Sequence, residues 1–371
     1  MKPIIFKLGD LVDLRISNSK ITKRDYRPNG QYNVITSSIK PSGKYDTFNE
    51  VAHQITISKD GTCGVIMWHE QPFYLAAGAF VIKPKDLTII NPKYLYHYLK
   101  RAQIAINKMQ IDYGPIKHLY RRDLSKLPVV VPNLSTQNQV VKVLDRLEQL
   151  AHQLRVKLNL RNQQFNYYLH ALLNFDRFYQ HPLINQSEPI KTIKLGQLAD
   201  IKSGAIIKNL SRFKKQALLD YGPYDIISGA LKPIGKWNRF NSLGKTITIT
   251  KDGNCGHVAW QAQPFWATEH CLTLTNQAPN LIDSKFLYYY LKAHEDQVKQ
   301  LKVPSAPPFL RIDDLKQVPI PLLNLDEQIK IVTMLEQLET TINNQQNHIS
   351  TLVTNVTNHY NRYLEQLIPT I

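Results

Sequence analysis

Hydrophobic residues recur at alternating steps of four and three along two long stretches of the chain. A step that averages 3.5 residues over several heptads is typical of the seam of a coiled coil. The pattern predicts two helices, each roughly 50 Å long at 1.5 Å per residue. A single amphipathic helix lying on its own domain is the alternative, but two stretches of equal length favour mutual pairing. The recurring positions are Val140, Leu144, Leu147, Ala151, Leu154, Leu158, Arg161, Phe165, Tyr168 and Leu172, and then Ile331, Leu335, Leu338, Ile342, Gln345, Ile349, Leu352, Val356, His359 and Tyr363.

The stretch before each long helix has the pattern of short strands and one shorter helix. Apolar and β-branched residues at Ile55–Ile57 and Thr246–Ile249 lie between turns rich in Gly, Pro and Asn, which predicts strands. A helix is expected around Pro92–Arg101 and a further strand at Leu127–Val131. The fold class expected from these elements is α/β, in the mixed α+β form.

These stretches are two copies of one unit. The segment TISKDGTCGVIMW from Thr56 returns as TITKDGNCGHVAW from Thr248, and Lys93–Lys100 returns as Lys285–Lys292. A solenoid would repeat every 20–50 residues or so and more than twice, so a whole domain has been duplicated. The expected organisation is a domain at 1–134, a long helix at 135–175, a linker at 176–192, a domain at 193–325 and a long helix at 326–371.

The direction of the two helices follows from the linker. In a parallel pair, residues 176–192 would have to travel back along the full helix, and with Pro182 and Pro189 they span that distance only when fully extended. In an antiparallel pair, the first helix carries the chain to the second domain and the linker only turns. We therefore predict two pseudo-two-fold-related globular domains joined by two long antiparallel coiled-coil helices, which would act as a ruler.

The charge balance indicates the kind of partner. The 371 residues carry a formal net charge of +17 at pH 7. Such an excess usually indicates a polyanionic partner, either nucleic acid or an anionic membrane surface, and a solvated basic surface is the alternative. No apolar stretch approaches the roughly 20 residues of a membrane span, and MKPIIFKLGDLVD lacks the apolar run of a signal peptide. We expect a cytoplasmic protein that binds nucleic acid and no membrane.

The sequence contains no recognisable catalytic motif. Walker A, GxGxxG and HExxH patterns are missing, and the three cysteines form no CxxC pair, so no metal site is predicted. Asn91-Pro92-Lys93-Tyr94 is similar to the Asn-Pro-Pro-Tyr motif of amino-methyltransferases, but Lys93 breaks the motif. Its counterpart Asp283-Ser284-Lys285-Phe286 favours a helix start capped by Asn91 or Asp283. We therefore predict a binding protein and not an enzyme.

The repeated loops carry candidate DNA contacts. In Lys59–Gly64 and Lys251–Gly256, Asp-Gly is a turn signal, and a lysine beside exposed backbone amides suits contact with phosphate. The alternative is an ordinary hairpin turn with solvated lysines, and Cys63 and Cys255 are expected to be small buried residues. The candidate DNA-binding residues are Lys40, Ser42, Lys44, Tyr45, Lys59, Asp60, Thr62, Gln110 and Tyr113 in the first copy, and Lys232, Lys236, Trp237, Lys251, Asp252, Asn254, His257, Lys302 and Ser305 in the second.

Other segments differ between the copies. Arg15–Arg27 shares little with Lys202–Tyr221, which contains an insertion, and Lys108–Tyr113 shares little with Lys299–Ser305. One scaffold with two different faces suits a protein that reads two different short sequences.

In this combination of features the sequence resembles the DNA specificity subunit of type I restriction–modification enzymes. The resemblance rests on the two-copy architecture, on the Lys-Asp-Gly-x-Cys-Gly loops, and on Val318-Pro319-Ile320-Pro321 leading into Glu327-Gln328-Ile329-Lys330-Ile331. The first copy departs from the last element, with Val130 for the second proline and Thr136-Gln137 for Glu-Gln.

The resemblance implies two target-recognition domains that each read one half of a bipartite site in double-stranded DNA. It implies that the helices bind two methyltransferase (modification) subunits and, through them, the motor–nuclease (restriction) subunits. It also implies that this chain binds no cofactor, since S-adenosylmethionine, ATP and Mg²⁺ would be bound by the partner subunits.

Two other classes of protein stay open. A stand-alone DNA methyltransferase or nuclease is disfavoured by the missing motifs, and such a protein would modify DNA without partners. A coiled-coil adaptor that does not bind DNA is disfavoured by the net charge and by the loops rich in Lys and Tyr. Salt-dependent DNA binding would separate the adaptor from the specificity subunit.

Overall fold

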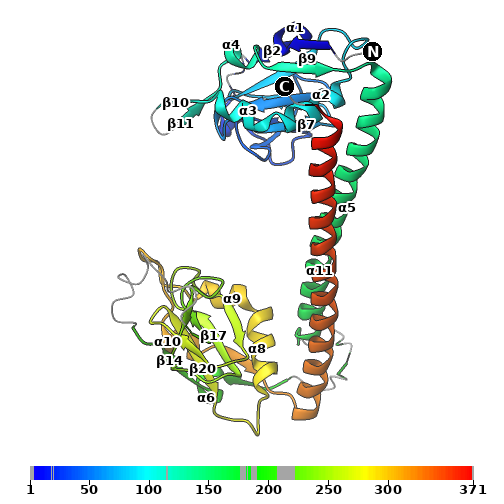
Figure 1. The fold of residues 1–371 in the computed structure, drawn as a ribbon. Coiled ribbons are helices and arrows are strands. Elements are labelled where there is room, and N and C mark those ends of the chain that lie inside the picture. The colour runs from blue at the N-terminus through cyan, green and yellow to red at the C-terminus, as the bar shows by residue number, and fades with distance from the viewer. Residues whose placement is uncertain are drawn as a thin grey trace. The chain divides into compact units, whose positions relative to one another are not determined.

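The computed structural model of the protein describes residues 4–369 except residues 18, 20, 114, 115, 176–180, 182, 185–189 and 207–221. Most of the predicted linker 176–192 and of the insertion within Lys202–Tyr221 lies outside the described residues. The chain forms two compact units: unit 1 comprises Met1–Lys157 and Ile349–Ile371, and unit 2 comprises Leu158–His348 (Figure 1). Each of the two long helices therefore has residues in both units.

Unit 1 begins with a succession of short strands and shorter helices, which leads into a long helix whose residues from Leu158 onward belong to unit 2. Its elements are β1 (Ile4–Lys7), α1 (Leu8–Leu11), β2 (Val12–Ile16), the 3-10 helix η1 (Lys23–Asp25), β3 (Tyr32–Ile35), β4 (Gly43–Tyr45), β5 (Gln54–Ser58), β6 (Asp60–Gly61), β7 (Ile66–His69), β8 (Tyr74–Leu75), β9 (Ala79–Pro84), α2 (Pro92–Arg101), α3 (Gln103–Lys108), β10 (Ile111–Tyr113), β11 (Ile116–His118), α4 (Arg121–Leu124), β12 (Pro128–Val131) and the long helix α5 (Leu134–Leu172).

Unit 2 repeats this order of elements. They are β13 (Thr192–Lys194), α6 (Leu195–Leu198), β14 (Ala199–Ser203), β15 (Tyr224–Ile227), β16 (Lys236–Trp237), β17 (Thr246–Thr250), β18 (Val258–Gln261), β19 (Phe265–Ala267), β20 (Cys271–Asn276), α8 (Ser284–Ala293), α9 (Glu295–Gln300), α10 (Ile312–Lys316), β21 (Pro319–Pro321) and the long helix α11 (Leu325–Leu367).

The sheets of the two units have the same topology. The central sheet is antiparallel, with strand order β2-β9-β5-β7 in unit 1 and β14-β20-β17-β18 in unit 2. A smaller sheet combines one antiparallel and one parallel pair, in the orders β4-β3-β8 and β16-β15-β19. The ribbons β1-β12 and β13-β21 pair the start of each unit with the strand before its long helix. A third sheet, β10-β11-β6, is described in unit 1, whereas the described part of unit 2 has isolated bridges from Phe309 to Asp252 and Val303 at the corresponding place.

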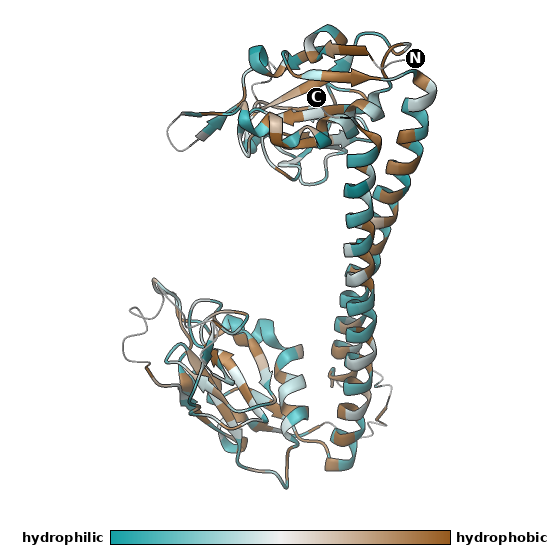
Figure 2. Cartoon of the chain, in the orientation of Figure 1, coloured by the Kyte–Doolittle hydropathy of each residue, from teal (hydrophilic) through white to brown (hydrophobic). Residues whose placement is uncertain are grey.

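The core of each unit forms around its central sheet. All five residues of β5 and all five of β17 are buried, because these strands lie inside their sheets and are covered on both faces. Figure 2 shows hydrophobic residues among the strands of each unit and alternating with polar residues along the long helices. The core of unit 1 includes Val140 and Leu144 of α5 and Leu364 of α11, and that of unit 2 includes Leu172 of α5 and Leu335 of α11. Both long helices thus contribute to both cores.

The helix α2 lies on the central sheet of unit 1 and begins as predicted. Asn91 Oδ1 accepts hydrogen bonds from the backbone amides of Lys93 and Tyr94 at 2.8 and 3.3 Å, which makes Asn91 the N-cap. Asp283 caps α8 in the same way. The interpretation of these two segments as helix starts is confirmed.

A buried glutamine joins each cap to the start of the following long helix. Gln137 Oε1 accepts a hydrogen bond from Asn91 N at 2.7 Å, and its amide donates to the carbonyls of Ile89 and Pro132. Gln328 makes the three equivalent bonds in unit 2, to Asp283, Leu281 and Leu323. Both glutamines are fully buried, so the side chain fixes the position of α2 or α8 against the long helix.

The long helices pair in antiparallel orientation. In unit 1, His97 contacts both Asp145 near the start of α5 and Tyr360 near the end of α11. In unit 2, Gln346 donates a hydrogen bond to Asn162 at 2.7 Å. Asn162 lies further along α5 than Asp145, whereas its partner Gln346 lies earlier on α11 than Tyr360, so the two helices run in opposite directions.

The predicted seam needs a correction. Tyr168, Gln345, Leu352, His359 and Tyr363 are exposed, whereas the residue after each of them is buried or half-buried. On α11 the buried stripe therefore takes nine steps to advance the 33 positions from Ile331 to Leu364. This average step is close to that of an 11-residue repeat and longer than the 3.5 residues of a strict heptad, so the heptad positions move off the buried face toward the end of each helix. In the described residues, no helix is both long and apolar enough to cross a lipid bilayer.

Candidate nucleic-acid interface

The repeated loop is a hairpin connection held together by its own side chains. In unit 1 it joins the antiparallel strands β5 and β7. The hydroxyl of Ser58 donates a hydrogen bond to the carbonyl of Thr62 and accepts one from Val65 N at 2.8 Å. The thiol of Cys63 donates to the carbonyl of Lys59 over 3.3 Å. These bonds fix the backbone on both sides of the turn.

The loop of unit 2 has the same framework. Thr250 Oγ1 donates to the carbonyl of Asn254 and accepts from His257 N at 2.9 Å. Cys255 Sγ donates to the carbonyl of Lys251, again over 3.3 Å. Sequence identity between the two loops therefore reflects a shared backbone conformation.

Two glycines in each loop have backbone angles that favour glycine. Gly61 and Gly253 have φ of 64° and 69°, and Gly64 and Gly256 have φ of 83° and 87°. A Cβ atom on Gly64 would also lie 2.6 Å from Gln110 Nε2. The neighbour that approaches Gly64 this closely is Gln110, which follows the helix α3.

Three segments of unit 1 meet at this loop. Thr62 Oγ1 donates to the carbonyl of Ser37 in the β3–β4 connection. Gln110 Nε2 donates to the carbonyl of Cys63 at 3.1 Å, and β6 pairs with β11. The segments 36–45, 59–64 and 110–118, which hold the nine candidates of the first copy, thus come together at one end of the unit. Figure 1 places β10 and β11 on the side of unit 1 away from α5.

The equivalent segments meet in unit 2. The backbone amide of Asn254 donates to the carbonyl of Gly229 at 2.9 Å, and its side-chain amide donates to the same carbonyl at 3.1 Å. Leu310 N donates to the carbonyl of Lys251 at 2.8 Å, and Asp252 forms a β-bridge with Phe309. The connection after β15, the repeated loop and the segment near 302–310 are therefore adjacent.

Charged side chains gather at the tip of each loop. In unit 1, Asp60 lies between Lys59 Nζ at 3.1 Å and His118 Nδ1 at 2.8 Å. In unit 2, Asp252 lies 2.9 Å from His270 Nδ1. The aspartate of the repeated motif thus has an imidazole neighbour in both units, although the two histidines come from different elements.

The two cysteines of the loops are structural. Burial, followed by the charge of Asp60, raises the pKa of the Cys63 thiol to about 11. Burial also raises the pKa of Cys255. Both thiols stay protonated near neutral pH, which suits their hydrogen bonds and does not suit nucleophilic chemistry. As predicted, Cys255 is buried, while Cys63 is half-buried.

The residues that hold the loop in place are more highly charged in unit 2 than in unit 1. Burial disfavours ionisation of Glu295, but hydrogen bonds from His257, Lys292 and Lys299 outweigh it and hold the pKa of Glu295 well below its usual range. The corresponding position in unit 1 is Gln103, which donates to the carbonyl of Gly64 at 2.8 Å. The same loop is therefore held by an ion cluster in one unit and by an amide in the other.

The candidate residues fall into two groups by exposure. Exposed side chains belong to Lys40, Lys44, Thr62, Lys232, Lys236, Asn254, Lys302 and Ser305. Half-buried side chains belong to Ser42, Tyr45, Lys59, Asp60, Gln110, Trp237, Lys251, Asp252 and His257. The side chain of Tyr113 lies outside the described structure.

Several candidates already have partners within the protein. The polar groups of Thr62, Asn254 and Gln110 hold the loop, and Ser42 Oγ lies 2.5 Å from Thr36 Oγ1. Tyr45 and Trp237 lie on β4 and β16 in the small sheets, opposite Tyr32 and Tyr224. The sequence analysis did not predict that Ser37, Gln103, His118 and His270 contact the loops. A signal was available for Gln103, because Gln103 and Asn107 are four residues apart and therefore neighbours on one face of a helix.

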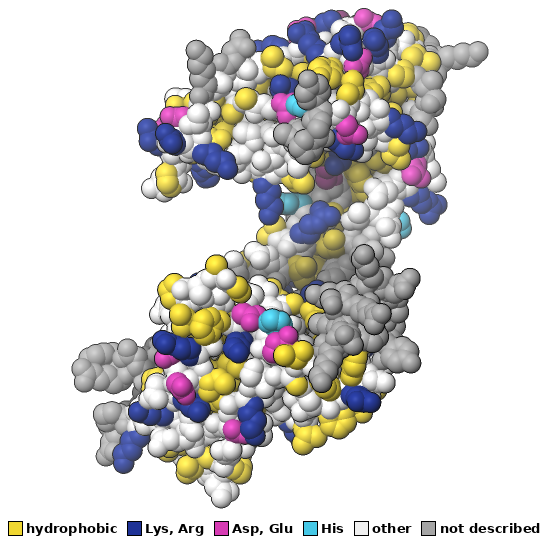
Figure 3. Space-filling model, turned by 90° about the vertical axis from the view of Figure 1, so that its left-hand side faces the viewer, with side chains coloured by type: hydrophobic (Ala, Val, Ile, Leu, Met, Phe, Trp, Pro, Cys, Tyr) yellow, Lys and Arg dark blue, Asp and Glu magenta, His cyan; other side chains and the backbone are white. Residues whose placement is uncertain are grey.

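Basic residues are widespread on the face drawn in Figure 3. Lys and Arg side chains occur on both units there, and Asp and Glu lie among them. Such a surface suits contact with a polyanion at several separate points, as a duplex backbone would offer.

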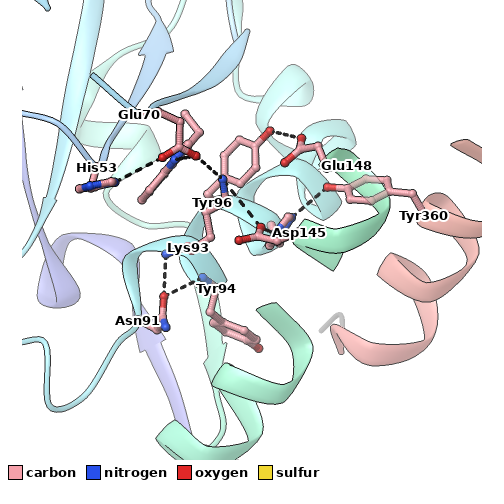
Figure 4. A network of polar contacts seen from close by, with 11 residues as sticks. His53, Glu70, Asn91, Lys93, Tyr94, Tyr96, Asp145, Glu148 and Tyr360 are labelled. Atoms are coloured by element: carbon pink, nitrogen blue, oxygen red, sulfur yellow. Dashed lines mark hydrogen bonds and ion pairs between the residues drawn. The ribbon is translucent and has the colours of Figure 1, made fainter. Parts of the chain in front are cut away.

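One group of possible metal ligands occurs among the described residues. His97, Asp145 and Glu148 place their ligand atoms within 4.8 Å of one another. Each already has a protein partner: His97 lies between Asp145 and Tyr360, and Glu148 accepts a hydrogen bond from Tyr96 at 2.6 Å (Figure 4). This arrangement serves as a polar joint between helices and does not suit a metal ion.

Comparison with known proteins identifies the class. The sequence profile of the family described as type I restriction modification DNA specificity domain matches residues 4–171 and, a second time, residues 187–352. Together the matches cover most of the chain, which belongs to this family. The resemblance inferred from the sequence is confirmed, as are the mixed α/β fold and the pairing of the two long helices.

Individual relatives span nearly the same length. A protein named as a type I specificity subunit of Mycoplasma pneumoniae is 23% identical over 324 residues, which are 85% of this chain and 83% of the relative. A specificity subunit of Haemophilus influenzae is 25% identical over 337 residues, or 85% and 82% of the two chains. The crystal structure of the S subunit of a type I restriction–modification system from M. genitalium aligns with a TM-score of 0.67 and 20% identity over 100% of this chain and 96% of that chain. A chain from a structural study of the assembly of the type I system aligns with a TM-score of 0.57 and 14% identity over 99% and 97% of the two chains. These structures share the fold.

Proposed function

We propose that each unit reads one half of a bipartite target in double-stranded DNA, as a specificity subunit of a type I restriction–modification complex. The observation that carries this proposal is the pair of equivalent loops. Their framework bonds from Ser58 and Thr250 are the same, while the side chains around them differ. A shared scaffold with different surfaces is what two related readers of different sequences require.

The recognition face of each unit is formed by the three segments that meet at the loop. Lys40 and Lys44 in unit 1 and Lys232 and Lys236 in unit 2 are exposed on the hairpins beside it. Such lysines suit phosphate contacts, which position a protein on DNA without reading bases. Base contacts would then come from the side chains that differ between the units.

The long helices are proposed to set the spacing between the two half-sites. α5 and α11 are continuous over 39 and 43 residues, or roughly 58 and 64 Å at 1.5 Å per residue. They are further proposed to bind two methyltransferase subunits. On α5, Leu160 and Tyr167 are exposed and lie seven positions apart, hence on one face of the helix, which suits a contact with a protein partner.

The chain is proposed to act without catalytic groups of its own, in the cytoplasm. S-adenosylmethionine, ATP and Mg²⁺ would be bound by the methyltransferase and motor–nuclease subunits. Incubation of the purified chain alone with DNA and these cofactors should give neither methylation nor cleavage. Modified DNA would instead favour the stand-alone enzyme.

An exchange of domains tests the proposal directly. Residues 1–134 are replaced by the first domain of a related specificity subunit, and methylated sites are mapped in a genome that carries the chimera with its partner subunits. We expect one half of the target to change while the other half is kept. The reciprocal exchange of residues 193–325 is the matched control and should change the other half. If both halves change in either chimera, the units do not read independently.

A further inference from the structure

A lysine of unit 1 is enclosed where the globular part meets the long helix α5 (Figure 4). Lys93 Nζ lies 4.4 Å from the ring centre of Trp68 on β7 and 5.0 Å from that of Tyr96 on α2. It also lies 3.5 Å from Glu70 Oε1 and 3.7 Å from Asp145 Oδ1 of α5. The side chain is only 14% exposed. One ammonium group thus links a strand of the central sheet with the long helix.

Further bonds surround this lysine. Tyr96 OH donates to Glu148 at 2.6 Å, one turn along α5 from Asp145. Burial and the charge of Glu148 raise the pKa of Tyr96, so its hydroxyl remains a donor. His97 lies between Asp145 of α5 at 2.7 Å and Tyr360 of α11 at 3.0 Å. The helix α2 is therefore fixed to both long helices.

Unit 2 contains a related arrangement, in which the tyrosine that donates to the long helix matches His97 and not Tyr96 in the repeat. Lys285 Nζ lies 4.8 Å from the ring centre of Trp260 and 3.3 Å from Glu336 of α11. Tyr289 OH donates to Glu339 at 2.6 Å, again one turn further along the long helix. Lysine, tryptophan and two acidic residues on one helical face are thus present in both units.

The geometry makes this contact sensitive to orientation. Two acidic residues three positions apart lie on one face of a helix, and a shift by one residue turns that face by about 100°. A lysine between aromatic rings and a carboxylate is held by charge from several sides, and burial strengthens this attraction. A change in the angle between the sheet and the long helix would separate the lysine from one side or the other.

We propose that Lys93 and Lys285 are positioning residues that determine which spacer length between the half-sites is accepted. Each lysine fixes the angle at which its recognition unit is carried by the long helices. In unit 1 the recognition face lies on the side away from α5, so a small change of angle at the joint moves that face a larger distance. The inference rests on the proposed function, in which the helices set the spacing.

The test uses the complete complex with its methyltransferase subunits. Binding is measured to duplexes that carry both half-sites with the cognate spacer, or with a spacer one base pair longer or shorter. The variants are Lys93→Met and Lys285→Met, which keep an apolar stem and remove the charge. We expect the preference for the cognate spacer to fall about tenfold in each, while half-site sequences are recognised as before.

Two further variants serve as controls. Lys93→Arg keeps a cation that stacks on aromatic rings and pairs with carboxylates, so it should retain the spacer preference. Lys142→Met removes an exposed lysine of α5 and should also leave it unchanged. Asp145→Asn removes the charge that faces Lys93, so it should also lower the preference for the cognate spacer. This variant provides the test if Lys93→Met does not fold.

The outcomes separate the two proposals. A wild-type complex with no fixed spacer between half-sites contradicts the proposed function itself. A selective wild type whose folded Lys93 and Lys285 variants keep the full spacer preference overturns only the role of the lysines. Equal weakening on all spacers would also overturn it, because it would show a structural role alone.

Discussion

Ser58 and Thr250 occupy the same position in the two units, and each uses one hydroxyl both to donate and to accept. A buried hydroxyl with both partners satisfied stabilises one loop conformation, because any other conformation leaves a buried group unpaired. The chain therefore repeats the loop sequence for a structural reason. Residues around the framework remain free to differ between the units.

The loop lysines give a test at this scale. Lys59→Ala removes an ammonium group beside the proposed phosphate contact and leaves Asp60 with His118 alone. DNA binding should weaken on every sequence, and the slope of log K against log salt should become shallower by about one unit. Lys251→Ala should act alike. The measurement is a salt titration of DNA binding, with Lys142→Ala as the control. If the slope is unchanged in both Lys59→Ala and Lys251→Ala, the two lysines are solvated turn residues that do not contact phosphate.

The candidate segments chosen from the sequence do meet at the repeated loop, but the individual contacts within them were not predicted. Lys59 and Asp60 do lie together at the turn, because turn signals and charge are local properties. The roles of Thr62 and Gln110 could not be predicted, since their polar groups are used by Ser37 and Cys63, which come from other segments. Whether a polar side chain is available to DNA depends on contacts that spacing along the chain does not reveal.

Between elements, the buried glutamine at the start of each long helix makes three hydrogen bonds that join this helix to the start of α2 or α8. Gln137→Leu keeps the size of the side chain but leaves Asn91 N and the carbonyls of Ile89 and Pro132 without this partner. Each unpaired buried group costs about 1–3 kcal/mol, so the free energy of unfolding should fall by at least 2 kcal/mol or so. Urea unfolding measures it, and Gln139→Leu at an exposed position of α5 is the control. A loss below about 0.5 kcal/mol would show that water replaces the glutamine.

The long helices themselves were predicted well, and their buried face only in part. Helix pairing follows from a strong apolar period, and the observed α5 (Leu134–Leu172) begins within one residue of the expected start. Leu352 and His359 were predicted to be buried between the helices but are exposed. The prediction assumed a strict heptad, whereas the buried residues of α11 recur at a longer average step. Polar residues such as Gln346 and aromatic residues such as Tyr360 occupy the true stripe, and their side chains give a weak apolar signal.

At the scale of the whole molecule, the proposed ruler can be lengthened. Four residues inserted after Leu154 in α5, with four after Val353 on the facing stretch of α11, add about 6 Å and slightly more than one helical turn, which leaves the buried stripe nearly in phase. The accepted spacer should then grow by one or two base pairs at about 3.4 Å each. Half-site sequences should stay the same. Methylation mapping measures both, and a spacer that keeps its original length would show that the helices do not set the distance.

The antiparallel helices also affect the order in which the protein can be assembled during synthesis. Unit 2 is one continuous stretch, Leu158–His348, whereas unit 1 needs Ile349–Ile371 in addition to Met1–Lys157. Leu364 and Ile368 belong to the core that contains Leu8 and Leu144. As the chain leaves the ribosome, the part made first thus stays incomplete until all of unit 2 has been made. A chain that ends between residues 348 and 363 would have all of unit 2 but would lack Leu364 and Ile368, so the core of unit 1 would remain open.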